Sequence, residues 1–241
     1  MRVCGKNVFN ELNYKDVRKV LIADTFKDQT IMDKIKTNKL KYVVTDQKIM
    51  DKMMPHNQGI IIEINDYEYK TLDVIEDDSL VVMLDHLEDP HNFGAIIRTC
   101  EAKGVKSIII PKDRGVVVNE TVMKTSAGAL NHVNIIMVTN LVTAMNKLKD
   151  KGYFVYSAEA DGKMYNEVDY ASKVLLVIGS EGNGLSRLVR ENSDEIISIP
   201  MRGVVNSLNA SVAAAILIYG IGELCNGWIS RWRISKSSLW K

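Results

Sequence analysis

The residues of this sequence that could do chemistry gather in three polar turns, and each turn follows an apolar stretch. They read DHLEDPHNFGAIIR at 85–98, IGSEGNGLS at 178–186 and IPMRGVVNSLNASVA at 199–213. Amide, carboxylate, hydroxyl and guanidinium groups in such turns bind polar ligands and hold reacting groups in place. Each turn therefore supplies candidates for a functional site.

The first turn has the pattern N-x-G-x-x-x-R at the expected start of a helix. Asn92 can cap that helix, and Gly94 permits the close approach of a ligand or of another backbone. Arg98 follows Gly94 by a little over one helical turn, so it can face the same side. Because a cation near a helix start opposes the helix dipole by about a few tenths of a kcal/mol, we expect Arg98 to meet an anionic or polar ligand.

The second turn places Glu181 among the glycines Gly179, Gly182 and Gly184. A glycine-rich turn after a buried strand can bind a nucleotide, but this one matches neither G-x-G-x-x-G nor the P-loop pattern, and the P-loop lysine is absent. The Glu181 carboxylate would repel a di- or triphosphate. It could instead accept hydrogen bonds from Arg98 or from a positively charged ligand.

The third turn offers Asn206, Ser207 and Asn209 just before an Ala-rich stretch that carries no charge until Glu223. Ser and Asn are good helix caps, so capping and ligand binding are both open for these side chains. A helix that is apolar on all sides is buried in its own core or against another subunit.

The elements that must position these turns begin at Leu80, where apolar strand-like segments alternate with helical ones. Such alternation predicts a mostly parallel sheet covered by helices on both faces, and ligands of such sheets bind beyond the carboxyl ends of the strands. The three turns fall at such ends. The expected strands cover 80–84, 107–110, 134–138, 153–158, 174–178 and 196–199.

The chain divides by composition into a small α/β domain at 1–68, a polar and acidic linker at 69–78 and a main domain at 79–225. A lysine cluster at 34–41 could contact phosphate or lie at a solvated helix end. The tail at 226–241 carries all three tryptophans with Arg and Lys and no acidic residue. It could stack on nucleic acid, pack on a partner subunit or be a disordered extension.

The overall composition is that of a globular protein, with 46% hydrophobic and 25% charged residues and a formal net charge of +1. A basic field over the whole molecule is therefore excluded, although a local basic patch is not. The three cysteines are odd in number and far apart, which fits reduced thiols, and no metal-ligand spacing is visible. No signal-peptide core and no membrane-length apolar run is present, so we expect a cytoplasmic protein without membrane or metal.

The three turns in this order, with SAGAL at 126–130 between the first two, resemble the SpoU (TrmH-like) class of the SPOUT RNA 2'-O-ribose methyltransferases. The likeness covers 81–223. The front segment, with GKNVFNEL near its start and HNQGIII at its end, is similar to the L30e/L7Ae-like substrate-binding domain of many such enzymes. This arrangement most resembles the RlmB-type enzymes, which methylate a guanosine in the P loop of large-subunit (23S) rRNA.

The resemblance implies an α/β fold of the SPOUT type, with a mostly parallel sheet and a deep C-terminal trefoil knot, preceded by the small L30e/L7Ae-like domain. It implies S-adenosyl-L-methionine as cofactor, RNA as substrate and a homodimer formed through the knot helices to complete the site. By motif position the catalytic residues are Asn92, Arg98, Glu181, Ser207 and Asn209. The cofactor-binding positions are Gly179, Gly182, Ile199, Ser207 and Leu208. The tryptophan-rich tail, and Asn134 where relatives often have proline, depart from the family.

Two mechanisms are open for the proton of the ribose hydroxyl. Arg98 either acts as the base after losing its charge, or it stays charged, grips the RNA phosphate and stabilises the developing alkoxide while a phosphate oxygen or water takes the proton. We favour the second, because a guanidinium is a poor base near neutral pH. Other functions remain open: methylation of tRNA, RNA binding or ribosome assembly without catalysis, and a nucleotide-binding α/β enzyme unrelated to RNA.

Overall fold

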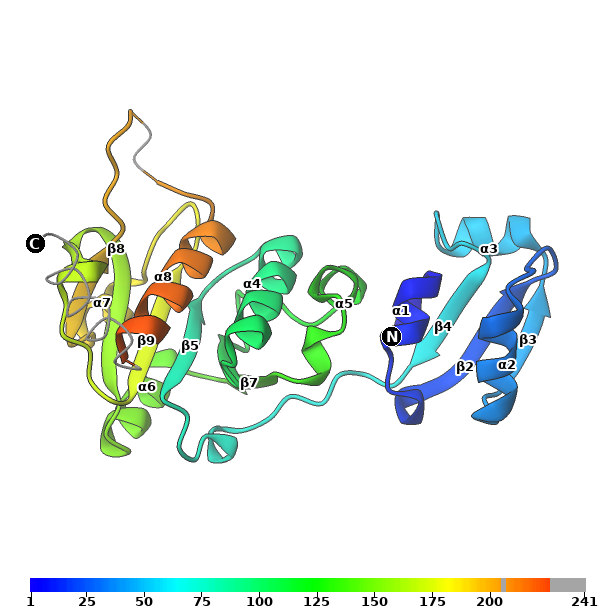
Figure 1. Cartoon of the computed structure of the whole chain (residues 1–241), viewed down its shortest axis with the longest axis horizontal. Helices are drawn as coiled ribbons and strands as arrows, with labels where there is room; N and C mark the ends of the chain where they lie inside the picture. Colours follow the sequence, from blue (N-terminus) through cyan, green and yellow to red (C-terminus); the bar gives the residue numbers. More distant parts are fainter. Residues whose placement is uncertain (205–206, 226–241) are drawn as a thin grey trace, which may run out of the picture.

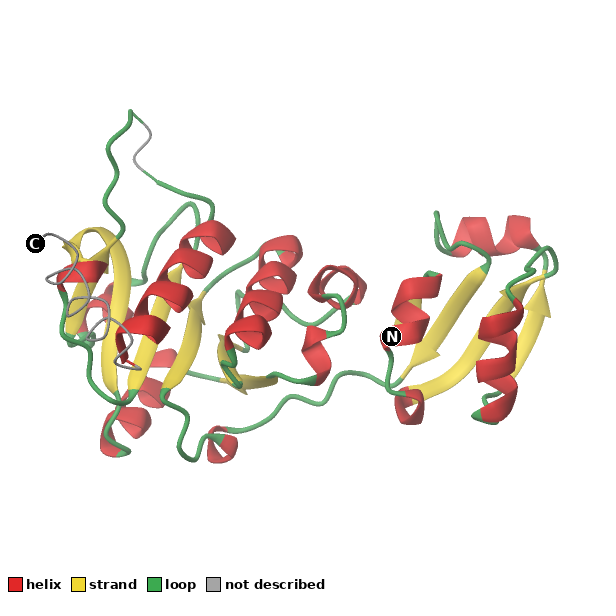
Figure 2. Ribbon diagram, in the orientation of Figure 1, coloured by secondary structure: helices red, strands yellow, loops and turns green. Residues whose placement is uncertain are grey.

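The computed structural model describes residues 1–204 and 207–225, with the side chains of 223–225 left aside (Figure 1). The expected tail at 226–241 and the candidate Asn206 lie outside the described residues. The described chain forms two sheets with their own helices, which follow one another along the sequence (Figure 2).

The first sheet has four strands in the order β1-β4-β2-β3 and is built from residues before Asn65. Strand β4 pairs antiparallel with β1 and β2, while β3 is a parallel edge strand beside β2. Strands and helices alternate along this segment. They are β1 (Arg2–Cys4), α1 (Lys6–Glu11), β2 (Val17–Ala23), α2 (Gln29–Thr37), β3 (Tyr42–Thr45), α3 (Gln47–Met53) and β4 (Ile60–Ile64).

The second sheet has six strands in the order β10-β8-β9-β5-β6-β7, and every pair is parallel. The alternation of strands and helices predicted from Leu80 is thus confirmed. The elements are β5 (Leu80–Asp85), α4 (Pro90–Lys103), β6 (Ser107–Pro111), α5 (Glu120–Ser126), β7 (Asn134–Val138), α6 (Leu141–Asp150), β8 (Phe154–Met164), β9 (Val174–Gly179), α7 (Arg187–Glu191), β10 (Glu195–Ser198) and α8 (Ala210–Cys225).

One strand is longer than expected, because β8 runs on to Met164 instead of ending at Ala158. Its pairing with β10 shifts register between Ile196 and Ile197, and the pairing then continues at Lys163. A register shift of this kind bends a strand and re-aims its side chains. The stretch beyond Ala158 is therefore held in the sheet and brought toward the carboxyl ends of β9 and β10.

Helices cover both faces of the second sheet, as the sequence predicts. Alternate strand residues point to opposite faces, so that Val82 packs with α4, α5 and α8, whereas Val81 packs with α6 and α7. In Figure 1, α8 and α4 lie next to each other on one face. Gly94 permits the close approach of α4 to α5, because a Cβ at this position would overlap Thr125.

Side-chain hydrogen bonds, in addition to the connecting chain, link the part that contains the first sheet to the part that contains the second. The Asn131 side chain donates to the Glu11 carbonyl at 2.7 Å, and the Cys4 thiol donates to Glu120 at 3.4 Å. Burial, together with the hydrogen bond to Glu120, raises the pKa of Cys4 to about 11. The thiol therefore stays protonated at neutral pH and keeps its role as a donor.

The stretch at 69–78, expected to be a linker, lies against the second sheet. Lys70 forms a parallel bridge with Ile136, and Ile75 is fully buried in the core formed by α6. The Tyr69 hydroxyl also accepts a hydrogen bond from the Val118 amide at 2.9 Å. This stretch is thus polar in composition but fixed by a few apolar anchors. Within the described ranges, no helix has the length and apolar character needed to cross a membrane.

Candidate active site

The three polar turns meet at the carboxyl edge of the second sheet. The first follows β5, the second follows β9, and these two strands are neighbours in register from Leu80 to Asp85. The third follows β10 and leads into α8. Because all strands are parallel, their carboxyl ends lie along one edge, which is the usual ligand-binding edge of such sheets.

Glu181, Asn92 and Asn209 form one hydrogen-bonded cluster, with a side chain from each turn. Glu181 Oε1 accepts from Asn92 Nδ2 at 2.6 Å and from Asn209 Nδ2 at 2.7 Å. The Ala210 amide at the start of α8 donates to the same oxygen at 3.1 Å, and Asn209 Nδ2 also lies 3.0 Å from Asn92 Oδ1. Glu181 Oε2 has no such partner among the described residues, so it is available to a further donor.

Asn92 does not cap α4, contrary to the expectation from sequence. Asp89 is the capping residue, since its side chain accepts from the His91 amide at 2.9 Å and Pro90 follows at the first helical position. Asn92 lies within the first helical turn of α4 and is buried, and its amide group points toward Glu181. Its side chain is therefore free to serve the cluster.

Asn209 caps α8, which is one of the two roles that the sequence left open, and it also joins the hydrogen-bonded cluster. Its Oδ1 caps α8 by accepting from the Ser211 amide at 2.9 Å and from the Ser211 hydroxyl at 2.6 Å. Its Nδ2 donates to Glu181 and Asn92. One side chain thus fixes the start of α8 and the position of the carboxylate together.

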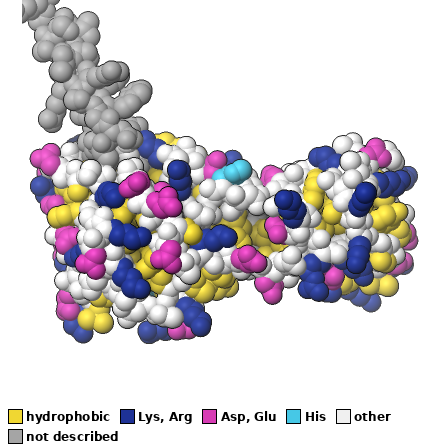
Figure 3. All heavy atoms as spheres, turned by 90° about the horizontal axis from the view of Figure 1, so that it is seen from below, with side chains coloured by type: hydrophobic (Ala, Val, Ile, Leu, Met, Phe, Trp, Pro, Cys, Tyr) yellow, Lys and Arg dark blue, Asp and Glu magenta, His cyan; other side chains and the backbone are white. Residues whose placement is uncertain are grey.

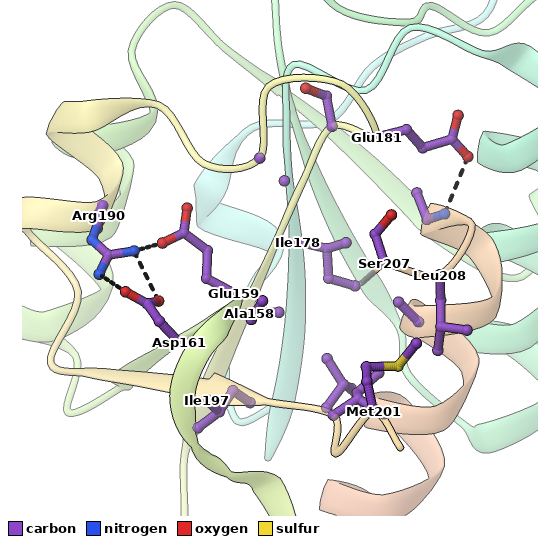
Figure 4. A pocket seen from close by; sticks show the side chains of 18 residues that line it. Ala158, Glu159, Asp161, Ile178, Glu181, Arg190, Ile197, Met201, Ser207 and Leu208 are labelled. Carbon is purple, nitrogen blue, oxygen red and sulfur yellow. Dashed lines mark hydrogen bonds and ion pairs between the residues drawn. The ribbon is translucent and has the colours of Figure 1, made fainter. Parts of the chain in front are cut away.

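A cavity of about 420 Å³ opens beside this cluster (Figure 4). Its volume falls within the range of about 300–1,000 Å³ that small-molecule sites occupy. Of the residues expected to bind a cofactor, Gly179, Ile199, Ser207 and Leu208 line the cavity, and Glu181, predicted as a catalytic residue, lines it as well. Gly182 is not among the lining residues, although Gly184 of the same turn is.

Gly179 and Gly184 of the second turn are explained by the backbone of the turn itself. Ser180 and Gly184 exchange two backbone hydrogen bonds of 3.0 and 2.9 Å, which fold the turn back on the end of β9. A Cβ at Gly179 would overlap the Gly184 backbone, and Gly184 itself has φ of 63°. The turn therefore needs glycine to close, and this closure presents Glu181 to the cavity.

Three charged residues of the cavity were not predicted from the sequence. Glu159 and Asp161 lie on the extended part of β8, and Arg190 of α7 contacts both carboxylates. Its guanidinium reaches Asp161 through two hydrogen bonds of 3.2 and 2.8 Å (Figure 4). The sequence signal for the two acidic residues is the AEAD stretch at 158–161, which follows the apolar part of β8 in the sequence. This stretch enters the site because β8 continues past its expected end.

Arg98 does not join the cluster within one chain, although motif position predicted it as a catalytic residue together with Asn92. Residues on a helix are rotated by about 100° from one to the next, so Arg98 lies on a different side of α4 from the buried Asn92. The Arg98 side chain is exposed. It has no hydrogen bond or ion pair with any described residue of its own chain.

The geometry defines the class of this protein: a three-layer α/β protein with a cavity and a hydrogen-bonded carboxylate at the carboxyl edge of a parallel sheet, the edge where such proteins bind ligands. The described part of the chain contains no cluster of His, Cys, Asp and Glu able to hold a metal ion. The chain belongs to the SpoU rRNA methylase family, whose model matches residues 79–219.

Relatives and solved structures agree with this assignment. A Staphylococcus saprophyticus protein assigned to the TrmH family of tRNA/rRNA methyltransferases is 43% identical over 218 residues, covering 85% of this chain and 87% of that protein. The SpoU methyltransferase AviRb from Streptomyces viridochromogenes, solved with AdoMet, has a TM-score of 0.79 at 23% identity, covering 95% of this chain and 91% of its own. An AdoMet-bound rRNA methyltransferase from Sinorhizobium meliloti has a TM-score of 0.74 at 21% identity, covering 92% and 86%. The predicted SPOUT α/β fold is thereby confirmed.

Proposed function

We propose that this protein transfers a methyl group from S-adenosyl-L-methionine to a ribose 2'-hydroxyl of RNA. The observation that carries the proposal is the convergence of Asn92, Glu181 and Asn209 beside the cavity. Membership of the SpoU family and the AdoMet held by AviRb, a protein of the same fold, support it.

The cavity has suitable walls for this cofactor. Apolar side chains of Ile178, Ile197 and Leu217 line it on one side, and Glu159 adds a carboxylate held by Arg190. The backbone around Gly179 and Leu208 borders the same space. Mixed apolar and polar surroundings of this kind suit a nucleoside joined to a charged amino-acid group, whose sulfonium supplies the methyl group when the cofactor is bound.

The cluster would then act by alignment. Holding two reactants in the right geometry lowers the activation barrier by roughly 7 to 11 kcal/mol. Side chains that are fixed by hydrogen bonds to one another maintain this geometry best. In this proposal the cluster orients the ribose and the exposed Ser207 contacts the ribose or the cofactor.

Arg98 belongs to this mechanism only if a second subunit supplies it. The outer side of α8 is apolar, with Val212 47% and Tyr219 43% exposed, and α4 lies beside it. A homodimer through these helices would cover the exposed side chains and bring Arg98 of the partner subunit toward the free Glu181 Oε2. There the guanidinium would stay charged, grip the RNA phosphate and stabilise the alkoxide, since it is a poor base near neutral pH. The hydroxyl proton would leave to a phosphate oxygen or water.

For the substrate we propose large-subunit rRNA, with a guanosine as the methylated nucleotide and the domain at 1–68 as the part that selects it. The Sinorhizobium meliloti structure of an rRNA methyltransferase matches 92% of this chain, including most of that domain. In the view of Figure 3, Lys and Arg side chains stand out on the surface of the smaller body. RNA recognition by shape and phosphate contact needs such groups.

Complementation between two inactive variants tests the proposal. Arg98→Ala should lose most methyl transfer to rRNA and keep its affinity for S-adenosylmethionine by calorimetry, and Glu181→Ala should do the same. A mixture refolded or co-expressed as heterodimers should regain activity, because one of its sites combines an intact Glu181 with an intact Arg98 from the other subunit.

The control is each variant mixed with itself, which should stay inactive. Wild-type protein that transfers no methyl group to RNA would refute the function. Active wild type with mixtures that stay inactive would refute the shared site and leave the function standing.

A further inference from the structure

A second cavity of about 390 Å³ lies at the same edge of the sheet, on the side of α6 and α7. It is bordered by the segments that follow three neighbouring strands and by the start of α7. Those segments contribute His86 after β5, Arg114 after β6 and Thr139 after β7. The cofactor proposed above occupies the other cavity, so this space is unassigned.

The charged groups of this cavity are mainly cationic. Arg114 is exposed and has no hydrogen bond or ion pair with any described residue, while Arg187 is paired with Glu191 at 2.7 Å. Asp113 is the acidic residue among those that line the cavity. A cation without a partner at the edge of a cavity is available to an anionic ligand such as phosphate.

The rest of the lining suits a flat apolar group. Pro111, Leu141 and Val142 form part of the wall, and Leu188 is 51% exposed at the cavity. A large apolar side chain with that much exposed surface gains by covering itself with a base or another apolar group. Cationic and apolar surfaces side by side match the two parts of a nucleotide.

The cavity is also built from constrained residues. His86 and Arg114 have φ of 55° and 53°, which residues other than glycine adopt rarely. The ring of His86 is fixed because its Nδ1 lies 2.5 Å from Asp85, a fully buried carboxylate that also accepts from the Ser186 amide at 2.6 Å. Strained backbone of this kind clusters at binding and catalytic sites.

The two cavities are close neighbours. Gly184 lines the first and Ser186 lines the second. Two residues of chain span at most about 7 Å. A ligand chain that reaches the first cavity with one unit can therefore reach the second with the next.

We propose that this second cavity binds a nucleotide of the RNA substrate that flanks the methylated one, with its phosphate on Arg114 and its base against Leu188. This inference rests on the proposed function, since it places a neighbour of the same RNA. The second cavity thus contributes to sequence context, while the first performs the transfer.

The test measures binding of large-subunit rRNA, isolated from cells lacking this protein, at several salt concentrations with S-adenosylmethionine present. Arg114→Ala should weaken binding and lower the slope of log affinity against log salt by about one, as loss of one phosphate contact does. Leu188→Ser should weaken binding about tenfold without changing the slope, because it removes a base contact and no charge.

The matched control is Lys147→Ala, which removes an exposed cation of α6 that does not line the cavity. It should change neither affinity nor slope, and all three variants should keep the wild-type affinity for S-adenosylmethionine. Arg114→Ala and Leu188→Ser behaving like Lys147→Ala would overturn the inference. The inference would also be overturned if the two variants weakened binding of free guanosine monophosphate but left RNA binding unchanged, because the cavity would then bind a free nucleotide. Methyl transfer by the wild type decides the proposed function separately.

Discussion

Glu181 Oε1 receives three hydrogen bonds, one from Asn92 of the first turn and two from the neighbouring residues Asn209 and Ala210 at the start of α8, so this oxygen joins the three turns. Its removal would leave Asn92, Asn209 and the start of α8 without a common acceptor. Because the other carboxylate oxygen has no partner among the described residues, Glu181 can hold the cluster with one oxygen and receive a ligand or a guanidinium with the other.

We therefore expect Glu181→Ala to lower the rate constant of methyl transfer to rRNA about a hundredfold, since misplacement by about 1 Å costs this much. Glu181→Gln should lose less, because its amide oxygen still accepts hydrogen bonds. Single-turnover methyl transfer measures both. The affinity for S-adenosylmethionine is the control and should change little. Equal turnover of Glu181→Ala and wild type would contradict the role of the cluster.

At this scale the sequence predicted which side chains come together better than it predicted their individual contacts. Motif order pointed to Asn92, Glu181 and Asn209, and the structure brings these three together. The sequence could not show that Asp89 takes the cap of α4, because Asp and Asn both cap helices well. It also missed Glu159, since the course of β8 depends on a register shift that no local pattern contains.

Among the elements, α8 is apolar on its buried side and also on part of its exposed side. One side of it is buried, with Ala214, Leu217 and Ile218 in the core. The opposite side exposes Val212 and Tyr219, which are seven positions apart and so share a side of the helix. The sequence left open whether α8 is buried in its own core or against a second subunit. The core of the same chain buries one side of the helix, and the exposed side is left for a second subunit to cover.

We expect Val212→Asp to convert a dimer into monomers, because burying an unpaired carboxylate costs several kcal/mol and lowers affinity by more than about a hundredfold. Analytical ultracentrifugation measures the change. Val43→Asp on the exposed strand β3 is the matched control and should leave the assembly unchanged. A Val212→Asp protein that keeps the mass of the wild type would contradict a dimer through α8.

Over the whole molecule, the sequence predicted the fold class and the parallel sheet because both follow from local alternation of apolar strands and helices. The trefoil knot stays a prediction of the family resemblance. The boundary at 69–78 shows the limit of composition, since a polar stretch looks like a free linker until its few apolar residues are placed. Ile75 is such a residue, and it is fully buried.

In the proposed function the domain at 1–68 selects the RNA and the part that contains the second sheet transfers the methyl group, which predicts the outcome of a truncation. The first sheet ends at Ile64, whereas Tyr67 and Tyr69 already pack against the core of the second. Removal of residues 1–65 therefore takes away one sheet and keeps these anchors of the other. Two linked binding modules gain about a hundredfold or more over one, so the truncated chain should lose at least this much methyl transfer to rRNA. Calorimetry should still show binding of S-adenosylmethionine, and undiminished methylation of rRNA would show that the first sheet does not select the substrate.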